Sequence, residues 1–166
     1  MSEYYKLVTR FIVNISKLIM SIIICLGAGG LGSLFTAPKI YSWYATLEKP
    51  FFTPPNWVFG PVWTTLYFLT GISLYLVWRQ KEEDNIKLAL LVFAGQLLLN
   101  IIWSLVFFAW ESPVFALLVI ILLWLAICTT IYLFYDIFSW SSYLLLPYLM
   151  WVSFAIILNF AIVILN

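Results

Sequence analysis

The chain has 166 residues, of which 65% are hydrophobic, 20% aromatic and only 9% charged, and its mean hydropathy is +1.07. A soluble domain carries about 25% charged residues, so the composition excludes a soluble domain and predicts an integral membrane protein. The net charge of +1 argues against a nucleic-acid partner. The chain has no histidine, which excludes a haem or zinc site ligated by that residue. We expect no metal site and no required cofactor.

Five apolar runs are long enough to cross a bilayer, which takes about 20 mostly apolar residues for about 30 Å of hydrocarbon. They are Leu18–Phe35, Asn56–Trp78, Lys87–Trp110, Val114–Tyr135 and Tyr143–Leu165. The sequence therefore predicts an all-α, multi-pass bundle of five transmembrane helices, forming a single domain over residues 1–166. The first run lacks a signal-peptide cleavage site, so it is interpreted as the first span.

Two features mark the first span and the segment before it. Residues 4–17 carry Lys6, Arg10 and Lys17 among apolar residues, which predicts a basic segment lying along the membrane interface. The small residues between Gly27 and Ser33 allow another helix to approach closely. We favour packing within the chain over dimerisation for this patch.

Loop charge predicts the orientation, because positive residues favour the cytoplasmic side. The side of the N-terminus collects six basic residues and the other side two: Lys6, Arg10, Lys17, Arg79, Lys81 and Lys87 against Lys39 and Lys49. We therefore predict a cytoplasmic N-terminus, with the first loop and the C-terminus on the far side.

The longest connection, residues 36–55, leads into a rigid, irregular stretch. Residues 47–63 hold four of the seven prolines, namely Pro50, Pro54, Pro55 and Pro61. Such a backbone beside a membrane is an unusual connector. We predict that this long structured loop covers and partly lines a pocket in the bundle.

Polar and aromatic stripes at helical spacing mark three of the predicted helices. They comprise Gly60, Trp63, Tyr67 and Gly71; Gln96, Asn100, Trp103 and Ser104; and Trp151, Ala155 and Asn159. At about 1.5 Å per residue, Gln96 lies near mid-membrane, and Asn100, Asn159 and Trp63 lie nearer the loop. The amides either bond between helices or face a pocket suited to a flat, apolar ligand such as a tetrapyrrole or a sterol.

The residues offer no strong catalytic constellation. There is no Ser/His/Asp arrangement and no pair of carboxylates within one span. Any chemistry would run through tryptophan or tyrosine redox, or through light absorbed by a ligand.

Several motifs together resemble the translocator protein family, also called tryptophan-rich sensory proteins and formerly peripheral-type benzodiazepine receptors. The resemblance covers about residues 29–160 and rests on WYATLEKP at Trp43–Pro50, PPNW at Pro54–Trp57, GPVWTTLY at Gly60–Tyr67, GQLLLN at Gly95–Asn100 with Trp103, and PYLMW at Pro147–Trp151 with Leu158 and Asn159. It implies five transmembrane helices, frequent homodimers and a ligand cavity closed by the first loop.

The resemblance also implies ligands and site residues. Its members bind porphyrins, haem, cholesterol or isoquinoline carboxamides, so porphyrin or haem is the expected ligand here. The positions that would line the cavity are Tyr44, Pro54, Trp63, Gln96, Asn100, Trp103, Trp151, Ala155 and Leu158. Trp63 and Trp151 match tryptophans implicated in light-dependent porphyrin breakdown in bacterial relatives, and would be the catalytic residues if that reaction occurs.

The sequence departs from the animal members of that family. Their cholesterol-recognition pattern needs a tyrosine followed by an arginine, where this chain has Phe160 and Ile164. A bacterial-type member in the cell membrane is therefore expected. Three functions stay open: a receptor or sensor that binds tetrapyrroles and regulates tetrapyrrole or stress responses, a light- and oxygen-dependent porphyrin-degrading enzyme, and, with less support, a porphyrin or sterol transporter.

Overall fold

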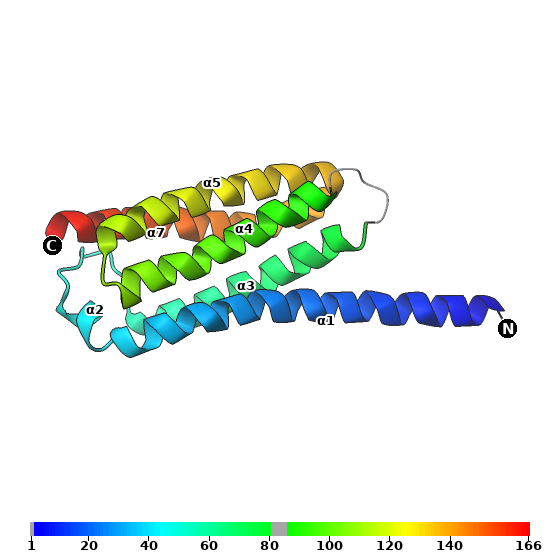
Figure 1. The fold of residues 1–166 in the computed structure, drawn as a ribbon, viewed down its shortest axis with the longest axis horizontal. Coiled ribbons are helices and arrows are strands. Elements are labelled where there is room, and N and C mark those ends of the chain that lie inside the picture. Colours follow the sequence, from blue (N-terminus) through cyan, green and yellow to red (C-terminus); the bar gives the residue numbers. More distant parts are fainter. Residues whose placement is uncertain (1, 81–85) are drawn as a thin grey trace.

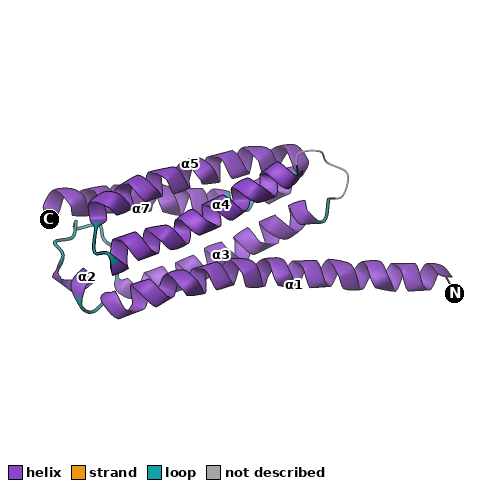
Figure 2. Ribbon diagram, in the orientation of Figure 1, coloured by secondary structure: helices purple, strands orange, loops and turns teal. Residues whose placement is uncertain are grey.

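A computed structural model describes residues 2–80 and 86–166, with side chains from Asn14 onward. The described ranges contain helices and connections but no strand (Figure 2). In chain order the elements are α1 Ser2–Thr36, the 3₁₀ turn η1 Ala37–Lys39, α2 Trp43–Thr46, α3 Asn56–Trp78, α4 Ile86–Ser104, the π-helical η2 Leu105–Ala109, α5 Pro113–Ile137, α6 Ser139–Tyr143 and α7 Leu146–Leu165.

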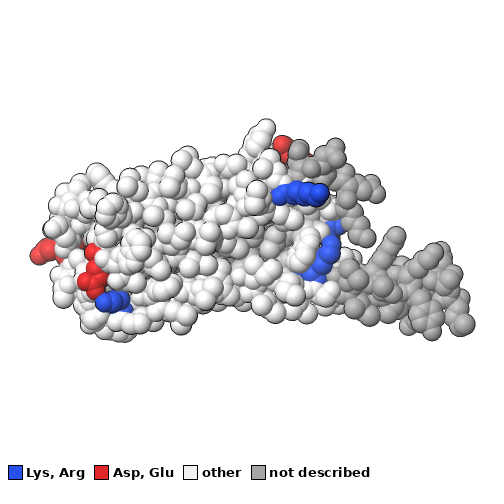
Figure 3. Space-filling model, in the orientation of Figure 1, with Lys and Arg blue, Asp and Glu red and all other residues white. Residues whose placement is uncertain are grey.

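Five long helices lie side by side as one bundle, and the two chain ends lie at opposite ends of it (Figure 1). Within the described ranges, five spans have the length and hydropathy to cross a membrane. Charged side chains gather at both ends of the visible face and are absent from its middle (Figure 3). Burying such charges in hydrocarbon is costly, so this distribution matches a bilayer. The prediction of an all-α, five-helix membrane protein is confirmed.

Prolines set several helix boundaries, because proline lacks the N–H that a helix interior needs but suits a first turn. Pro38 follows the end of α1, Pro113 is the first residue of α5, and Pro147 lies in the first turn of α7. Pro55 directly precedes α3, which spans Asn56–Trp78 as predicted.

The expected interfacial segment at residues 4–17 is wrong as a separate element. The helix α1 runs without interruption from Ser2 to Thr36 and projects straight beyond the bundle at the N-terminal end (Figure 1). No proline or glycine occurs before Gly27, so nothing breaks the helix and turns its start into the plane of the membrane.

The third and fifth spans also differ from the prediction. The third was expected to be regular up to Trp110, but its last turn is π-helical, with the Trp110 amide donating to the Leu105 carbonyl at 3.0 Å. The segment around Trp140, which lies between the fourth and fifth predicted spans, is the short helix α6. Extended backbone at Phe138 ends α5 and starts this helix, where the Ser141 hydroxyl donates to the Phe138 carbonyl at 2.6 Å.

The backbones of α1 and α3 lie close together at Gly71. A Cβ built there would lie 2.8 Å from the Ile22 Cα and 3.2 Å from the Ser21 carbonyl oxygen. Only a glycine therefore fits at this crossing. At the same end of the bundle, Lys17 Nζ donates to the Trp78 carbonyl at 3.0 Å.

Candidate functional site

A cavity of about 550 Å³ lies within the bundle at the end where the first loop is found. Its walls come from the C-terminal half of α1, the N-terminal half of α3, the end of α4, η2 and α7. Apolar surface dominates these walls, with Asn100, Ser104 and Asn159 among the few polar contributors.

The first loop covers this cavity; we call residues 37–55 the lid. Tyr44, from α2, is 6% exposed and lines the cavity. Its ring centroid lies 6.2 Å from that of Phe107 and 5.8 Å from that of Phe108, both on η2. Burial raises the pKa of the Tyr44 phenol above its ordinary value, so Tyr44 stays neutral at physiological pH. Lys49 Nζ lies 4.8 Å from the centre of the same ring.

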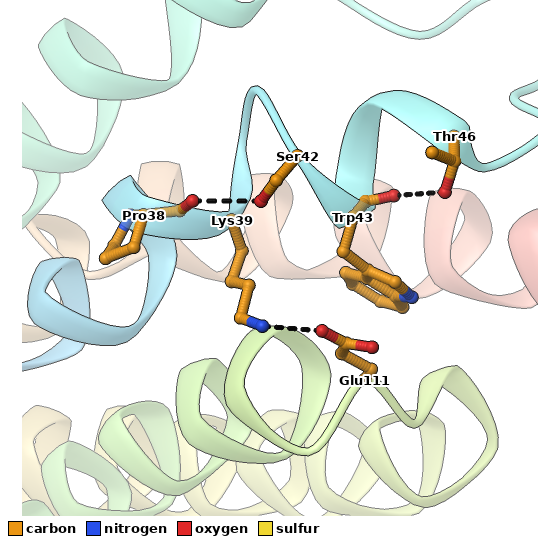
Figure 4. Close-up of polar contacts among 6 residues, drawn as sticks. All are labelled: Pro38, Lys39, Ser42, Trp43, Thr46 and Glu111. Carbon is orange, nitrogen blue, oxygen red and sulfur yellow. Dashed lines mark hydrogen bonds and ion pairs between the residues drawn. The ribbon is translucent and has the colours of Figure 1, made fainter.

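Besides these ring contacts, an ion pair and a pair of hydrogen bonds fasten the lid to the rest of the protein. Lys39 Nζ lies 2.6 Å from the Glu111 carboxylate, which joins η1 to the turn between η2 and α5 (Figure 4). At the other side, the Glu48 amide donates to Asn166 Oδ1 at 3.0 Å, and Asn166 Nδ2 donates to the Glu48 carbonyl at 3.0 Å. Within the lid, the Ser42 and Thr46 hydroxyls donate to backbone carbonyls one turn earlier (Figure 4).

Aromatic rings form most of the remaining wall. Trp63 stacks on Tyr67 with centroids 5.6 Å apart and an interplanar angle of 29°. Trp151 meets Phe59 edge-on at 5.9 Å, and Trp103 lies 5.4 Å from Phe107. Such rings present large, rigid apolar faces.

Asn100 forms the polar floor of the cavity. Its Oδ1 accepts a hydrogen bond from the Tyr67 hydroxyl at 2.5 Å, and its Nδ2 donates to the Tyr148 hydroxyl at 2.8 Å. All three side chains are at most 7% exposed. The Asn100 amide thus joins α3, α4 and α7 and keeps both tyrosine hydroxyls paired inside the bilayer.

Asn159 makes a second cross-helix connection. Its Oδ1 accepts from Trp103 Nε1 at 3.2 Å, and its Nδ2 donates to the Pro113 carbonyl at 2.9 Å. These bonds join α7 to α4 and to the start of α5, and they hold the Trp103 indole against the cavity. Both asparagines therefore do what the helix-joining interpretation requires, and they also lie on the cavity wall.

The structure places seven of the nine predicted site residues around this cavity: Tyr44, Trp63, Asn100, Trp103, Trp151, Ala155 and Leu158. Gln96 and Pro54 are not among the described lining residues. Gln96 lies one turn beyond the floor formed by Asn100, is 1% exposed, and its amide has no hydrogen-bond partner among the described residues. Pro54 lies near the end of the lid, just before α3.

Two groups of cavity residues were missed from the sequence. Phe107 and Phe108 face the lid because η2 is π-helical. No residue type in the sequence predicts a π-helical turn, so these two residues were not expected at the cavity. The patch between Gly27 and Ser33 was recognised, but as a packing surface alone. A Cβ at Gly29 would lie 2.5 Å from the Tyr67 ring, so this glycine does serve packing within the chain while it lines the cavity.

The fold and this site define a polytopic helical membrane protein with an aromatic chamber beneath a fastened loop. A sequence model of the TspO/MBR family matches residues 21–165, and the chain belongs to that family. It is 50% identical over 153 residues to the tryptophan-rich protein TspO of Archaeoglobus fulgidus, covering 92% of this chain and 99% of the relative.

Two further relatives come from a bacterium and from human. The tryptophan-rich protein TspO of Chlorobaculum tepidum is 45% identical over 158 residues, covering 92% of this chain and 98% of the relative. The human translocator protein is 38% identical over 136 residues, covering 80% of this chain and 79% of the relative. The resemblance inferred from the motifs is confirmed, and family membership supports a membrane sensor or receptor role.

Proposed function

We propose that the protein is a membrane receptor or sensor that binds a tetrapyrrole, such as protoporphyrin IX or haem, or a related flat hydrophobic molecule, in the cavity beneath the lid. The observation that carries the proposal is the composition of the wall, in which indole and phenyl faces surround a few paired amides. Ligand pockets commonly hold about 300–1,000 Å³, and this cavity of about 550 Å³ falls in that range. The chain has no histidine for haem iron, so metal-free porphyrin is the better first probe.

Titration of the purified protein with protoporphyrin IX tests this proposal. We expect saturable quenching of tryptophan emission and a shifted porphyrin absorption band. An Ala155→Trp variant fills the cavity from α7, so it should raise Kd by about tenfold or more, equivalent to about 1.4 kcal/mol. The matched control is Ile157→Trp, because Ile157 is exposed on the same helix and is not among the lining residues. Equal affinity in both variants would exclude this cavity as the binding site.

A porphyrin-degrading activity is the second candidate, favoured because Trp63 and Trp151 both line the cavity. The stacked Trp63–Tyr67 pair provides adjacent redox-active rings next to a bound pigment. The reaction would use light and molecular oxygen as the oxidant. Illumination in air should then bleach the porphyrin Soret band and yield a new product, and Trp63→Phe or Trp151→Phe should abolish the product. Binding without bleaching in the unaltered protein leaves the receptor function alone.

Transport of porphyrin or sterol has less support. Many transporters carry their site on broken helices that are related by an internal repeat. Within the described ranges, the breaks from α-helical geometry lie toward the ends of the spans, in η2 and at the turn between α6 and α7, rather than at mid-membrane.

A further inference from the structure

The cavity has exposed walls on one side only. The described residues that both line it and are exposed come from two stretches: Leu26, Gly30, Ser33 and Ala37 on α1 and η1, and Asn56, Trp57, Gly60 and Thr64 on α3. Every other described lining residue is buried or half-buried. Apart from the consecutive Asn56 and Trp57 at the start of α3, the members of each stretch are three or four residues apart, so each stretch is one face of its helix. The cavity therefore opens sideways, between α1 and α3.

The contact between these two helices changes along its length; we call it the α1–α3 seam. At Gly71 the backbones nearly touch, since an added Cβ would lie 2.8 Å from the Ile22 Cα. At Gly29 the Tyr67 ring fills the space, 2.5 Å from an added Cβ. At Gly30 and Gly60 an added Cβ meets no atom within 4 Å. The seam is closed at the N-terminal end of the bundle and open beside the cavity.

The opening reaches the depth of the lipid chains. Leu26 lies ten residues before the end of α1 at Thr36, which corresponds to about 15 Å along the helix and to about half of the hydrocarbon thickness. The rim presents no unpaired hydroxyl, because Ser33 donates to the Gly30 carbonyl at 2.7 Å and Thr64 to the Gly60 carbonyl at 2.9 Å. The rim is thus compatible with contact by acyl chains and by an apolar ligand.

In contrast to the opening between α1 and α3, the path into the cavity through the lid is closed. Tyr44 is 6% exposed beneath the lid, and the Lys39–Glu111 ion pair and the Glu48–Asn166 hydrogen bonds fasten the lid toward α5 and α7. The groups that hold the lid, Glu111 and Asn166, belong to the turn before α5 and to the end of the chain after α7.

We propose that the α1–α3 seam is a lateral portal, through which a flat hydrophobic ligand passes between the hydrocarbon layer and the cavity without opening the lid. The portal rests on the proposed ligand-binding function and adds the route to it. Small side chains at its rim set the width, so rim size controls the rates of entry and exit while the cavity wall sets affinity.

The test measures rates and affinity separately, with protoporphyrin IX and protein reconstituted in phosphatidylcholine vesicles. Stopped-flow quenching of tryptophan emission gives the association rate, and a chase with excess empty vesicles gives the dissociation rate. Gly30→Leu and Thr64→Trp narrow the rim, so each should slow both association and dissociation by about tenfold or more, and Kd should therefore change much less than either rate.

Neighbouring positions on the same helices provide matched controls. Gly27→Leu on α1 and Thr65→Trp on α3 add the same side chains at exposed positions that do not line the cavity. Gly27 is also in open space, and the Thr65 hydroxyl makes the same bond to its own helix, at 2.9 Å to the Pro61 carbonyl. Both controls should keep the rates of the unaltered protein.

Each other outcome has a defined meaning. Unchanged rates in Gly30→Leu and Thr64→Trp, with acceleration in a Lys39→Ala variant that releases the lid, would overturn the portal in favour of entry from water. A raised Kd with faster dissociation in the rim variants would show that they fill the cavity, which also overturns the portal. Absence of any saturable quenching in the unaltered protein would overturn the proposed function, and the portal with it.

Discussion

At the scale of single residues, asparagine amides do two tasks in this protein at once. Asn100 and Asn159 each bridge three helices and also contribute polar surface to the cavity. Polar groups buried in hydrocarbon need partners, and here the partners are tyrosine hydroxyls, an indole and a backbone carbonyl. Each amide already gives one N–H and its oxygen to partners within the protein, so a ligand meets the wall mainly through its rings.

Replacing Asn100 by leucine should therefore damage the fold as well as the cavity. The change leaves the Tyr67 and Tyr148 hydroxyls buried without their partner, and each unsatisfied group costs about 1–3 kcal/mol. We expect a lower Tm in detergent. Adding Tyr67→Phe removes one stranded hydroxyl, so the double variant should lose less stability than the sum of the single changes. Additive losses would show that the hydrogen bond is not formed.

The adjacent glycines Gly29 and Gly30 allow the effect of one added methyl group on stability to be compared at two positions. Gly29→Ala forces a methyl group against the Tyr67 ring, 2.5 Å away, and overpacking of this kind costs about 1–3 kcal/mol. Gly30→Ala adds the same methyl in open space, where replacing glycine in a helix stabilises by about 0.5–1 kcal/mol. Thermal unfolding should show Tm falling in the first variant and unchanged or rising in the second. Equal shifts would contradict the assigned packing of α1 on α3.

At the scale of elements, the lid and η2 are the parts that regular helix rules do not specify. The π-turn brings the consecutive Phe107 and Phe108 side chains under α2, and the chain then reverses through Glu111, which has a positive φ of 52°. A non-glycine residue in that conformation carries backbone strain. The ion pair with Lys39 connects this strained turn to the lid, so the turn and the lid form one contact region.

Removing that ion pair should loosen the lid without weakening the bundle. Lys39 and Glu111 are 36% and 38% exposed, and an exposed pair contributes at most about 1 kcal/mol. In Lys39→Ala we expect faster amide hydrogen exchange over residues 40–50 and almost no change in Tm. Thr129→Ala, an exposed polar change in mid-α5, serves as the control. A large fall in Tm for Lys39→Ala would mean that the lid contributes to global stability.

Much of the fold was predictable because its signals are local. Pro55 and the charged run from Arg79 bracket α3 to the residue, and helical spacing aligned Asn100, Trp103 and Asn159 with the cavity. The depth of the floor was not predictable. Gln96 follows the same stripe but lies below the Asn100 cluster, and spacing along one helix does not reveal which side chains of other helices close the space above it.

At the scale of the whole molecule, an odd number of spans places the two ends of the chain on opposite membrane faces. The five spans and the positions of the termini at opposite ends of the bundle (Figure 1) agree with this. The lid then shares a face with the C-terminus, as its bonds to Asn166 require. Because the portal opens between helices, ligand access is independent of which aqueous face the lid meets.

The distribution of charge predicts the orientation in the membrane. The end of the bundle that carries Lys17, Arg79 and Lys87 has more basic residues than the lid end, which carries Lys39 and Lys49, and Lys39 is partly neutralised by Glu111. The positive-inside rule therefore predicts a cytoplasmic N-terminus and an exterior lid. In a bacterial host, alkaline phosphatase fused after Asn166 should be active and a green fluorescent protein fused there should be dark. Basic residues can be moved to the lid end by combining Arg79→Ala and Lys87→Ala with Thr46→Lys and Glu48→Lys. This variant should increase the fraction of molecules inserted in the opposite orientation. A fluorescent C-terminal fusion in the unaltered protein would reverse the assignment.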